Sequence, residues 1–207
     1  MCFENISMRI SVITTINPPD NLSHGVGLKN FSIVIGDAKT PQNWEEQSGE
    51  QLTFVSLKEQ YKQFPKLSQL LPENHYSRKN IGYLLALKNG ATEIYDTDDD
   101  NTIIAGTTFP SFSGRYDNIV STTTGSCFFN IYSLYTDKKI WARGFPLDQI
   151  NNPVSVQITQ QSSNLAIWQG LVNVDPDIDA IYRLTRELPF SFEKQGEFVL
   201  KVIYKAQ

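Results

Sequence analysis

Arg9-Ile-Ser-Val-Ile-Thr-Thr15 is a short run of mostly β-branched residues that stops at the turn-forming stretch Asn17-Pro18-Pro19-Asp20. Two similar runs follow, at Phe31–Gly36 and at Leu52–Leu57. Apolar runs that are nearly continuous indicate strands buried on both faces, and the segments between these runs are long enough for crossover connections. The sequence therefore predicts an α/β fold with a mostly parallel central sheet flanked by helices.

The next elements are read from helix and strand signals further along the chain. The clearest helix is expected over Ser77–Asn89, with Ser77 as its N-cap and Gly90 in a left-handed conformation at its end. A strand over Ala91–Tyr95 then leads directly into an acidic stretch. Beyond it we expect irregular loops and short strands up to residue 153, followed by strands at 154–158 and 164–168, a short helix at 177–184 and a last strand at 198–204.

Composition limits the classes of protein that this chain can belong to. The 207 residues are 40% hydrophobic and 12% aromatic with a net charge of -4, which is enough apolar material for one sizeable core and excludes intrinsic disorder. An acidic chain has no basic excess with which to bind nucleic acid. We expect no membrane span, because the longest dense apolar stretch, near Leu84–Leu87, is far shorter than a bilayer requires.

The N-terminal residues and the two cysteines bear on the cellular location of the protein. The first residues lack a secretory signal pattern, and Cys2 and Cys127 have no metal-binding spacing, so both are interpreted as free thiols. For a complete chain, these observations predict a cytoplasmic location.

The stretch Asp96-Thr-Asp-Asp-Asp-Asn101 places four carboxylates within five residues. Such acids repel one another, and a hard divalent cation such as Mg²⁺ or Mn²⁺ would offset the repulsion. A solvated acidic turn is the alternative, but ligands of α/β sheets bind beyond the carboxyl ends of strands, where this stretch is expected. The acidic stretch fits two other kinds of site poorly. An EF-hand calcium loop would need a glycine and a final glutamate that are absent here. An aspartyl phosphatase would need an uninterrupted apolar strand before its nucleophile. The DxD signature of nucleotide-sugar glycosyltransferases remains, as a short motif.

Other polar residues are expected near the same end of the sheet. Arg78 and Lys79 fall in the predicted first helical turn, where backbone N–H groups favour anions, and they indicate either a phosphate partner or a solvated basic turn. Residues at the ends of the first two predicted strands would line a base and ribose pocket or simply form turns; they are Thr14, Thr15, Asn17 and Asp37.

Six segments in the same order resemble the STELLO-type glycosyltransferases. They are Ser11-Val-Ile-Thr-Thr-Ile-Asn-Pro-Pro19, Val34-Ile-Gly-Asp-Ala-Lys-Thr-Pro41, Arg78-Lys-Asn-Ile-Gly-Tyr83 with Asn89-Gly-Ala91, Tyr95-Asp-Thr-Asp-Asp-Asp100, Ala142-Arg-Gly-Phe-Pro-Leu147 and Asp175-Pro-Asp-Ile-Asp-Ala-Ile-Tyr-Arg-Leu184. The acidic triplet, the Arg-Gly-aromatic-Pro motif and the Asp-x-Asp-Ala segment are more distantly similar to the reversibly glycosylated polypeptides, which are nucleotide-sugar mutases. STELLO-type chains continue well beyond the last segment, so residues 1–207 are expected to form a single GT-A-like catalytic domain that could belong to a larger protein.

Both resemblances imply a GT-A fold, with a Rossmann-like sheet and a DxD motif at a strand end, that uses a UDP-sugar with Mn²⁺ or Mg²⁺. The implied reaction is sugar transfer to a glycan or another hydroxyl acceptor in polysaccharide biosynthesis. A nucleotide-sugar mutase and a binding module without turnover are the alternatives.

The resemblance also implies roles for individual residues. Asp98 and Asp100 would hold the metal, and Arg143 would lie near the anomeric carbon, unless it is a structural arginine. Asp177 or Asp179 would be the general base, or either would cap the following helix. The residues implied to bind the nucleotide sugar are Thr14, Thr15, Asn17, Asp37, Arg78, Lys79, Asp98 and Asp99.

Overall fold

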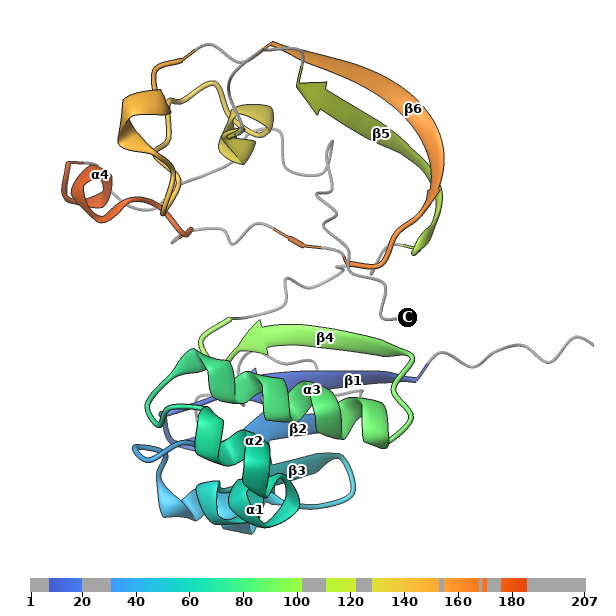
Figure 1. Ribbon diagram of the computed structural model, residues 1–207, viewed down its shortest axis with the longest axis vertical. Helices are drawn as coiled ribbons and strands as arrows, with labels where there is room; N and C mark the ends of the chain where they lie inside the picture. The colour runs from blue at the N-terminus through green and yellow to red at the C-terminus, as the bar shows by residue number, and fades with distance from the viewer. Residues whose placement is uncertain are drawn as a thin grey trace, which may run out of the picture. The chain divides into compact units, whose positions relative to one another are not determined.

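The computed structural model describes residues 8–19, 31–101, 111–121, 128–152, 155–167, 169–170 and 176–185. The chain divides into two compact units, Met1–Thr107 and Thr108–Gln207, which are described separately below (Figure 1). That residues 1–207 act as one catalytic domain stays a prediction.

The first unit contains a four-stranded parallel sheet. Its strands are β1 (Arg9–Thr14), β2 (Phe31–Ile35), β3 (Leu52–Val55) and β4 (Glu93–Asp98), in the order β3-β2-β1-β4. Three of these strands match the predicted apolar runs, and the parallel α/β sheet is confirmed. The fourth continues past Tyr95, so that Asp96 and Asp98 lie inside the strand rather than in the loop after it.

The strand order reverses direction beside β1. The chain passes from β1 to β2 and β3 on one side, and then returns to place β4 on the other side of β1. Thr14 and Asp98, the last residues of β1 and β4, are direct partners in the register. This pair of strand ends is therefore the switch point at which open α/β sheets bind ligands.

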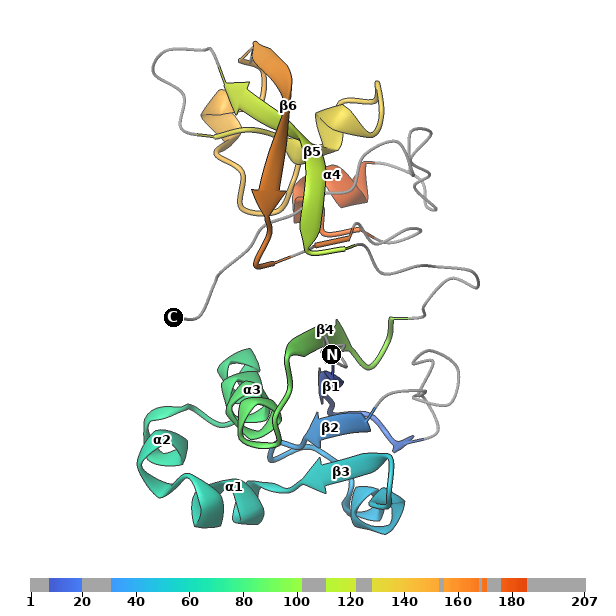
Figure 2. The same ribbon diagram turned by 90° about the vertical axis from the view of Figure 1, so that its right-hand side faces the viewer.

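Three helices cover one face of this sheet (Figures 1 and 2). They are α1 (Leu57–Gln63), α2 (Pro65–Leu70) and α3 (Lys79–Lys88). The predicted N-cap of the third helix is wrong, because Tyr76–Arg78 form a separate 3-10 turn, η3, in which His75 accepts a hydrogen bond from the Ser77 N–H. The predicted left-handed end is confirmed, since Gly90 has a φ of 84°.

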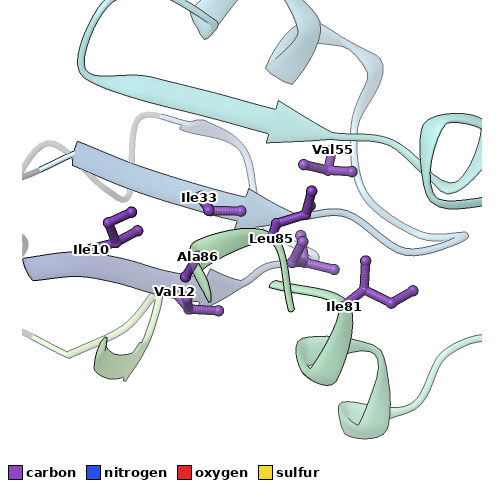
Figure 3. Close-up of a cluster of buried hydrophobic side chains, with 8 residues drawn as sticks. Ile10, Val12, Ile33, Val55, Ile81, Leu85 and Ala86 are labelled. Atoms are coloured by element: carbon purple, nitrogen blue, oxygen red, sulfur yellow. The ribbon is translucent and has the colours of Figure 1, made fainter. Parts of the chain in front are cut away.

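Alternate residues of the central strands pack on opposite faces. Ile10 and Val12 of β1, with Ile33 of β2, pack against Ile81 and Leu85 of α3 in the main core (Figure 3). On the other face, Ile13 and Val34 pack against Trp44 of η2 (Gln42–Gln47). Burial on both sides is the reason why these strands appear in the sequence as continuous apolar runs.

The helix α3 approaches the sheet closely at one glycine. A Cβ atom at Gly82 would lie 3.0 Å from the Ile35 Cγ1 atom and even closer to the Val12 side chain. Glycine suits this position because a larger residue would force the Val12 and Ile35 side chains to shift. This contact holds the start of α3 near the carboxyl ends of the strands.

The second unit contains a long antiparallel ribbon. It is made of β5 (Ser113–Ser121) and β6 (Val156–Asn164). The prediction of only short strands before residue 153 is wrong for β5, and the two strands predicted at 154–158 and 164–168 are replaced by the one strand β6. Most β6 side chains are exposed, so its apolar pattern is too weak to mark its bounds.

A small aromatic core lies elsewhere in the second unit. The short helices η4 (Ile131–Leu134), η5 (Leu147–Gln149) and α4 (Ala180–Leu184) belong to this unit. The core contains Tyr132, Tyr135, Ile140, Ile178 and Tyr182. The predicted helix at 177–184 is confirmed only from Ala180, and the predicted last strand at 198–204 lies outside the described residues. Among the described helices, none combines the length and apolar character that crossing a bilayer demands.

Candidate functional site

Three predicted residues converge at the carboxyl ends of β1 and β4. The Asp99 Oδ2 atom accepts hydrogen bonds from the Thr15 hydroxyl at 2.5 Å and from the Asn17 side-chain amide at 2.9 Å. These residues directly follow the paired ends of β1 and β4, so the register of the sheet brings them together. We call these three residues the strand-end cluster; the structure brings them together, and their binding of a nucleotide sugar stays a prediction. Thr14 lies at the end of β1, opposite Asp98.

The loop after β1 is held in place by two residues that the sequence did not single out as site residues. The Thr40 hydroxyl donates a hydrogen bond to the Thr15 carbonyl at 2.5 Å, and the indole N–H of Trp44 donates to the Asn17 carbonyl at 2.7 Å. Trp44 itself is buried, with 1% of its surface exposed. In the sequence, Trp44 is surrounded by polar residues, so no pattern there pointed to a role near the site.

Lys79 lies among the acids of β4. Its ammonium group is 2.5 Å from Asp96 Oδ1 and 2.8 Å from Asp98 Oδ1, and it donates to the Thr97 carbonyl at 2.9 Å. Burial alone lowers the pKa of Lys79, but the hydrogen bonds and charges of Asp96 and Asp98 outweigh it, so the pKa is raised. Asp96 also accepts a hydrogen bond from the Tyr83 hydroxyl. Burial, together with this hydrogen bond, raises the pKa of Tyr83.

The acidic stretch does not converge on one point in this arrangement. Asp96 and Asp98 contact Lys79 from α3, whereas Asp99 contacts the residues after β1. Asp100 is exposed on the following turn. Among the described residues, no three acidic, histidine or cysteine side chains come together as a possible metal site. The described residues alone thus form no complete metal site, and metal binding by Asp98 and Asp100 stays a prediction.

Asp37 and Arg78 are used by the fold of the first unit. The Asp37 carboxylate accepts hydrogen bonds from the backbone N–H groups of Asn74 at 2.8 Å and His75 at 3.1 Å. Arg78 is 1% exposed and donates to Gln60 Oε1 and to the Leu71 carbonyl, both at 3.0 Å. Ribose binding by Asp37 and diphosphate binding by Arg78 thus stay predictions, while the geometry gives both side chains a structural role.

The second unit holds two more of the predicted residues in an exposed ion pair. Arg143 Nη1 lies 3.1 Å from Asp177 Oδ1, and their side chains are 67% and 77% exposed. An antiparallel bridge between Ala142 and Ile178 aligns the two backbones. Beneath them, the Tyr132 hydroxyl donates to the Asp177 carbonyl at 2.9 Å, and burial together with the Asp177 charge raises the pKa of Tyr132 to about 12. Arg143 and Asp177 thus place two exposed charged groups side by side on the surface of the second unit.

Asp179 has a different position from Asp177. Its Oδ1 atom accepts hydrogen bonds from the backbone N–H groups of Ile181 at 2.9 Å and Tyr182 at 3.0 Å, so that Asp179 is the N-cap of α4. The capping alternative considered in the sequence analysis is therefore observed for Asp179 and not for Asp177.

Comparisons with known proteins support the resemblance seen in the motifs. The chain is 28% identical over 194 residues to probable glycosyltransferase STELLO2 of Arabidopsis thaliana, and 27% identical over 191 residues to probable glycosyltransferase STELLO1 of the same plant. These alignments cover 87% and 86% of this chain but only 25% and 24% of the relatives. No family model matches the chain. The predicted distant homology to STELLO-type proteins is confirmed.

Proposed function

We propose that this chain binds a nucleotide sugar, most simply a UDP-sugar, and transfers its sugar to a hydroxyl acceptor. The observation that carries the proposal is the strand-end cluster at the switch point of a parallel sheet. The distant homology to probable glycosyltransferases supports the reaction class. A GT-A fold would place the nucleotide at this end of the sheet.

Asp99 is the residue best placed to recognise the nucleoside. Its Oδ2 atom is fixed by Thr15 and Asn17, which orients the carboxylate before any ligand arrives. A carboxylate accepts hydrogen bonds from paired ribose hydroxyls, as acidic residues do at other switch-point sites. Preorganisation of this kind reduces the ordering cost of binding.

In the transfer step, we assign the general base to Asp177. It would accept the proton of the acceptor hydroxyl while that oxygen bonds to the anomeric carbon and the bond to the diphosphate oxygen breaks. Arg143 lies beside it, with its Nη1 atom 3.1 Å from Asp177 Oδ1. Asp179 is not assigned this role, because its carboxylate is used to cap α4. A divalent ion, when bound, would offset the charge of the leaving diphosphate.

Binding is tested by calorimetric titration of the full chain with UDP and with uridine. Asp99→Asn should weaken both ligands about tenfold or more, because a charged hydrogen bond to ribose is lost in each case. Asp148→Asn, which removes an exposed negative charge from the second unit, is the control and should bind as the wild type does. Unchanged affinity in Asp99→Asn, or no UDP binding by the wild type, would contradict the proposal.

Turnover is tested with a panel of nucleotide sugars, with and without hydroxyl acceptors. Release of nucleoside diphosphate that requires an acceptor supports a transferase. Isomerisation of the sugar would instead identify a mutase, and binding without conversion would identify a binding module.

A further inference from the structure

The ammonium group of Lys79 lies between two acids of β4, and one of them, Asp98, is a predicted metal ligand. A lysine has three N–H donors, and the three shortest contacts of Lys79 are to Asp96, Asp98 and the Thr97 carbonyl. The single positive charge of Lys79 therefore compensates part of the negative charge of the two acids that flank Thr97.

This cation is difficult to displace because it is buried. The side chain of Lys79 is 1% exposed, while those of Asp96 and Asp98 are 45% and 48% exposed. A metal ion on Asp98 would lie only a few ångströms from the ammonium group, and like charges at that distance repel strongly. Moving Lys79 aside would leave a buried charge without partners.

Asp98 and Asp99 have different surroundings. Asp98, the last residue of β4, contacts Lys79 of α3, while Asp99, in the turn after β4, contacts the loop after β1. Asp98 and Asp99 therefore serve different partners, although they are adjacent in the sequence.

We propose that Lys79 is a built-in counter-cation of the nucleotide-sugar site, and that Asp98 is consequently not a metal ligand. Lys79 is a positioning residue that fixes the end of β4, from which Asp99 projects. The inference rests on the proposed function for its role in sugar transfer, but the contacts that carry it are independent of any nucleotide.

The test is a titration of the full chain with Mn²⁺ alone, followed by calorimetry. The wild type and Asp98→Asn should show the same Mn²⁺ affinity within about threefold, whether that affinity is measurable or absent. Asp148→Asn controls for the loss of one negative charge. A larger loss of Mn²⁺ affinity in Asp98→Asn than in this control would overturn the proposal.

A second variant tests the counter-cation directly. Lys79→Met keeps a long side chain but removes the charge, so Asp96 and Asp98 should gain a Mn²⁺ site that binds at least about tenfold more tightly than the wild type. Adding Asp98→Asn should abolish that gain, and a gain that persists would count against the proposal. If Lys79→Met does not fold, the comparison of the wild type with Asp98→Asn decides alone.

The two proposals fail separately in these experiments. Absence of UDP binding with equal Mn²⁺ affinities would refute only the proposed function. UDP binding together with a Mn²⁺ ion held by Asp98 would refute only the inference.

Discussion

Arg78 shows how a basic residue in a predicted phosphate-binding turn can instead hold two helices together. Its guanidinium donates to Gln60 in α1 and to the Ser68 and Leu71 carbonyls in and after α2. Arginine suits this position because its planar donors reach several acceptors at once.

Arg78→Ala should lower the free energy of unfolding by about 2–4 kcal/mol, because several buried acceptors lose their partner. Urea denaturation of the full chain measures this change. Arg115→Ala, at an exposed position of β5, is the control and should stay within about 0.5 kcal/mol of the wild type. Unchanged stability with a selective loss of UDP affinity over uridine affinity would favour the diphosphate role instead.

Tyr132 gives a prediction for alkaline pH. Its pKa is raised from 10.0 to about 12 in the folded chain, so the native state keeps this proton at a pH where the unfolded chain has lost it. The stabilisation is therefore complete below pH 10 and is lost as the pH rises toward 12. Tyr132→Phe should cost about 1 kcal/mol at neutral pH through the lost hydrogen bond to Asp177.

The measurement is thermal unfolding of both proteins from pH 8 to pH 11.5. The difference in stability between wild type and Tyr132→Phe should shrink above pH 10. A difference that stays constant across this range would show that Tyr132 titrates normally.

At the residue scale, the sequence predicted positions better than partners. Thr15 and Asn17 were expected at the strand ends near the acidic stretch, and the structure shows them in contact with Asp99. The contacts of Lys79 and Arg78 could not be predicted, since they depend on how far β4 extends into the acids and on which way each side chain turns. Asp177 and Asp179 were both candidates for the base and for the helix cap, and the start of α4 shows that Asp179 is the cap.

At the scale of elements, Gly82 sets the distance between α3 and the sheet. Gly82→Ala should destabilise the chain by about 1–3 kcal/mol through overpacking against Val12 and Ile35. A loss of stability would be informative, because in an ordinary helix replacing glycine by alanine raises stability by about 1 kcal/mol. Leu87→Ala, at an exposed position of the same helix, should change stability by less than about 0.5 kcal/mol.

Urea unfolding of both variants measures this difference. Increased stability in Gly82→Ala would show that α3 can move away from the sheet without cost. The close approach seen here would then not constrain the site.

Elements buried on two faces were predicted well, and exposed ones were not. β1, β2 and β3 show in the sequence because both faces require apolar residues. The ribbon of β5 and β6 exposes polar residues such as Gln160 and Gln161, which resemble those of a loop. Backbone pairing rather than side-chain burial defines that ribbon, so the bounds of β5 and β6 cannot be read from their residue types.

At the scale of the whole molecule, the two units should differ in local stability. The central strands of the first unit contain residues that are fully buried, including Ile10, Val12 and Val34. The ribbon of the second unit has two strands and mostly exposed side chains. A two-stranded ribbon has little burial to resist local opening.

Native-state hydrogen exchange should therefore show amides of β1 and β2 exchanging at least about 100-fold more slowly than paired amides of β5 and β6. Mass spectrometry of peptides from each strand measures the rates in one sample. Equal protection in the two sheets would show that the ribbon is covered in solution.

Trp44 supplies the first unit with an optical reporter. The chain has three tryptophans, and the other two, Trp141 and Trp168, fall in the second unit. The indole N–H of Trp44 is bonded to the carbonyl of Asn17, one residue of the strand-end cluster. In a chain with Trp141→Phe and Trp168→Phe, the emission wavelength of the remaining indole would follow nucleotide titration without any attached dye.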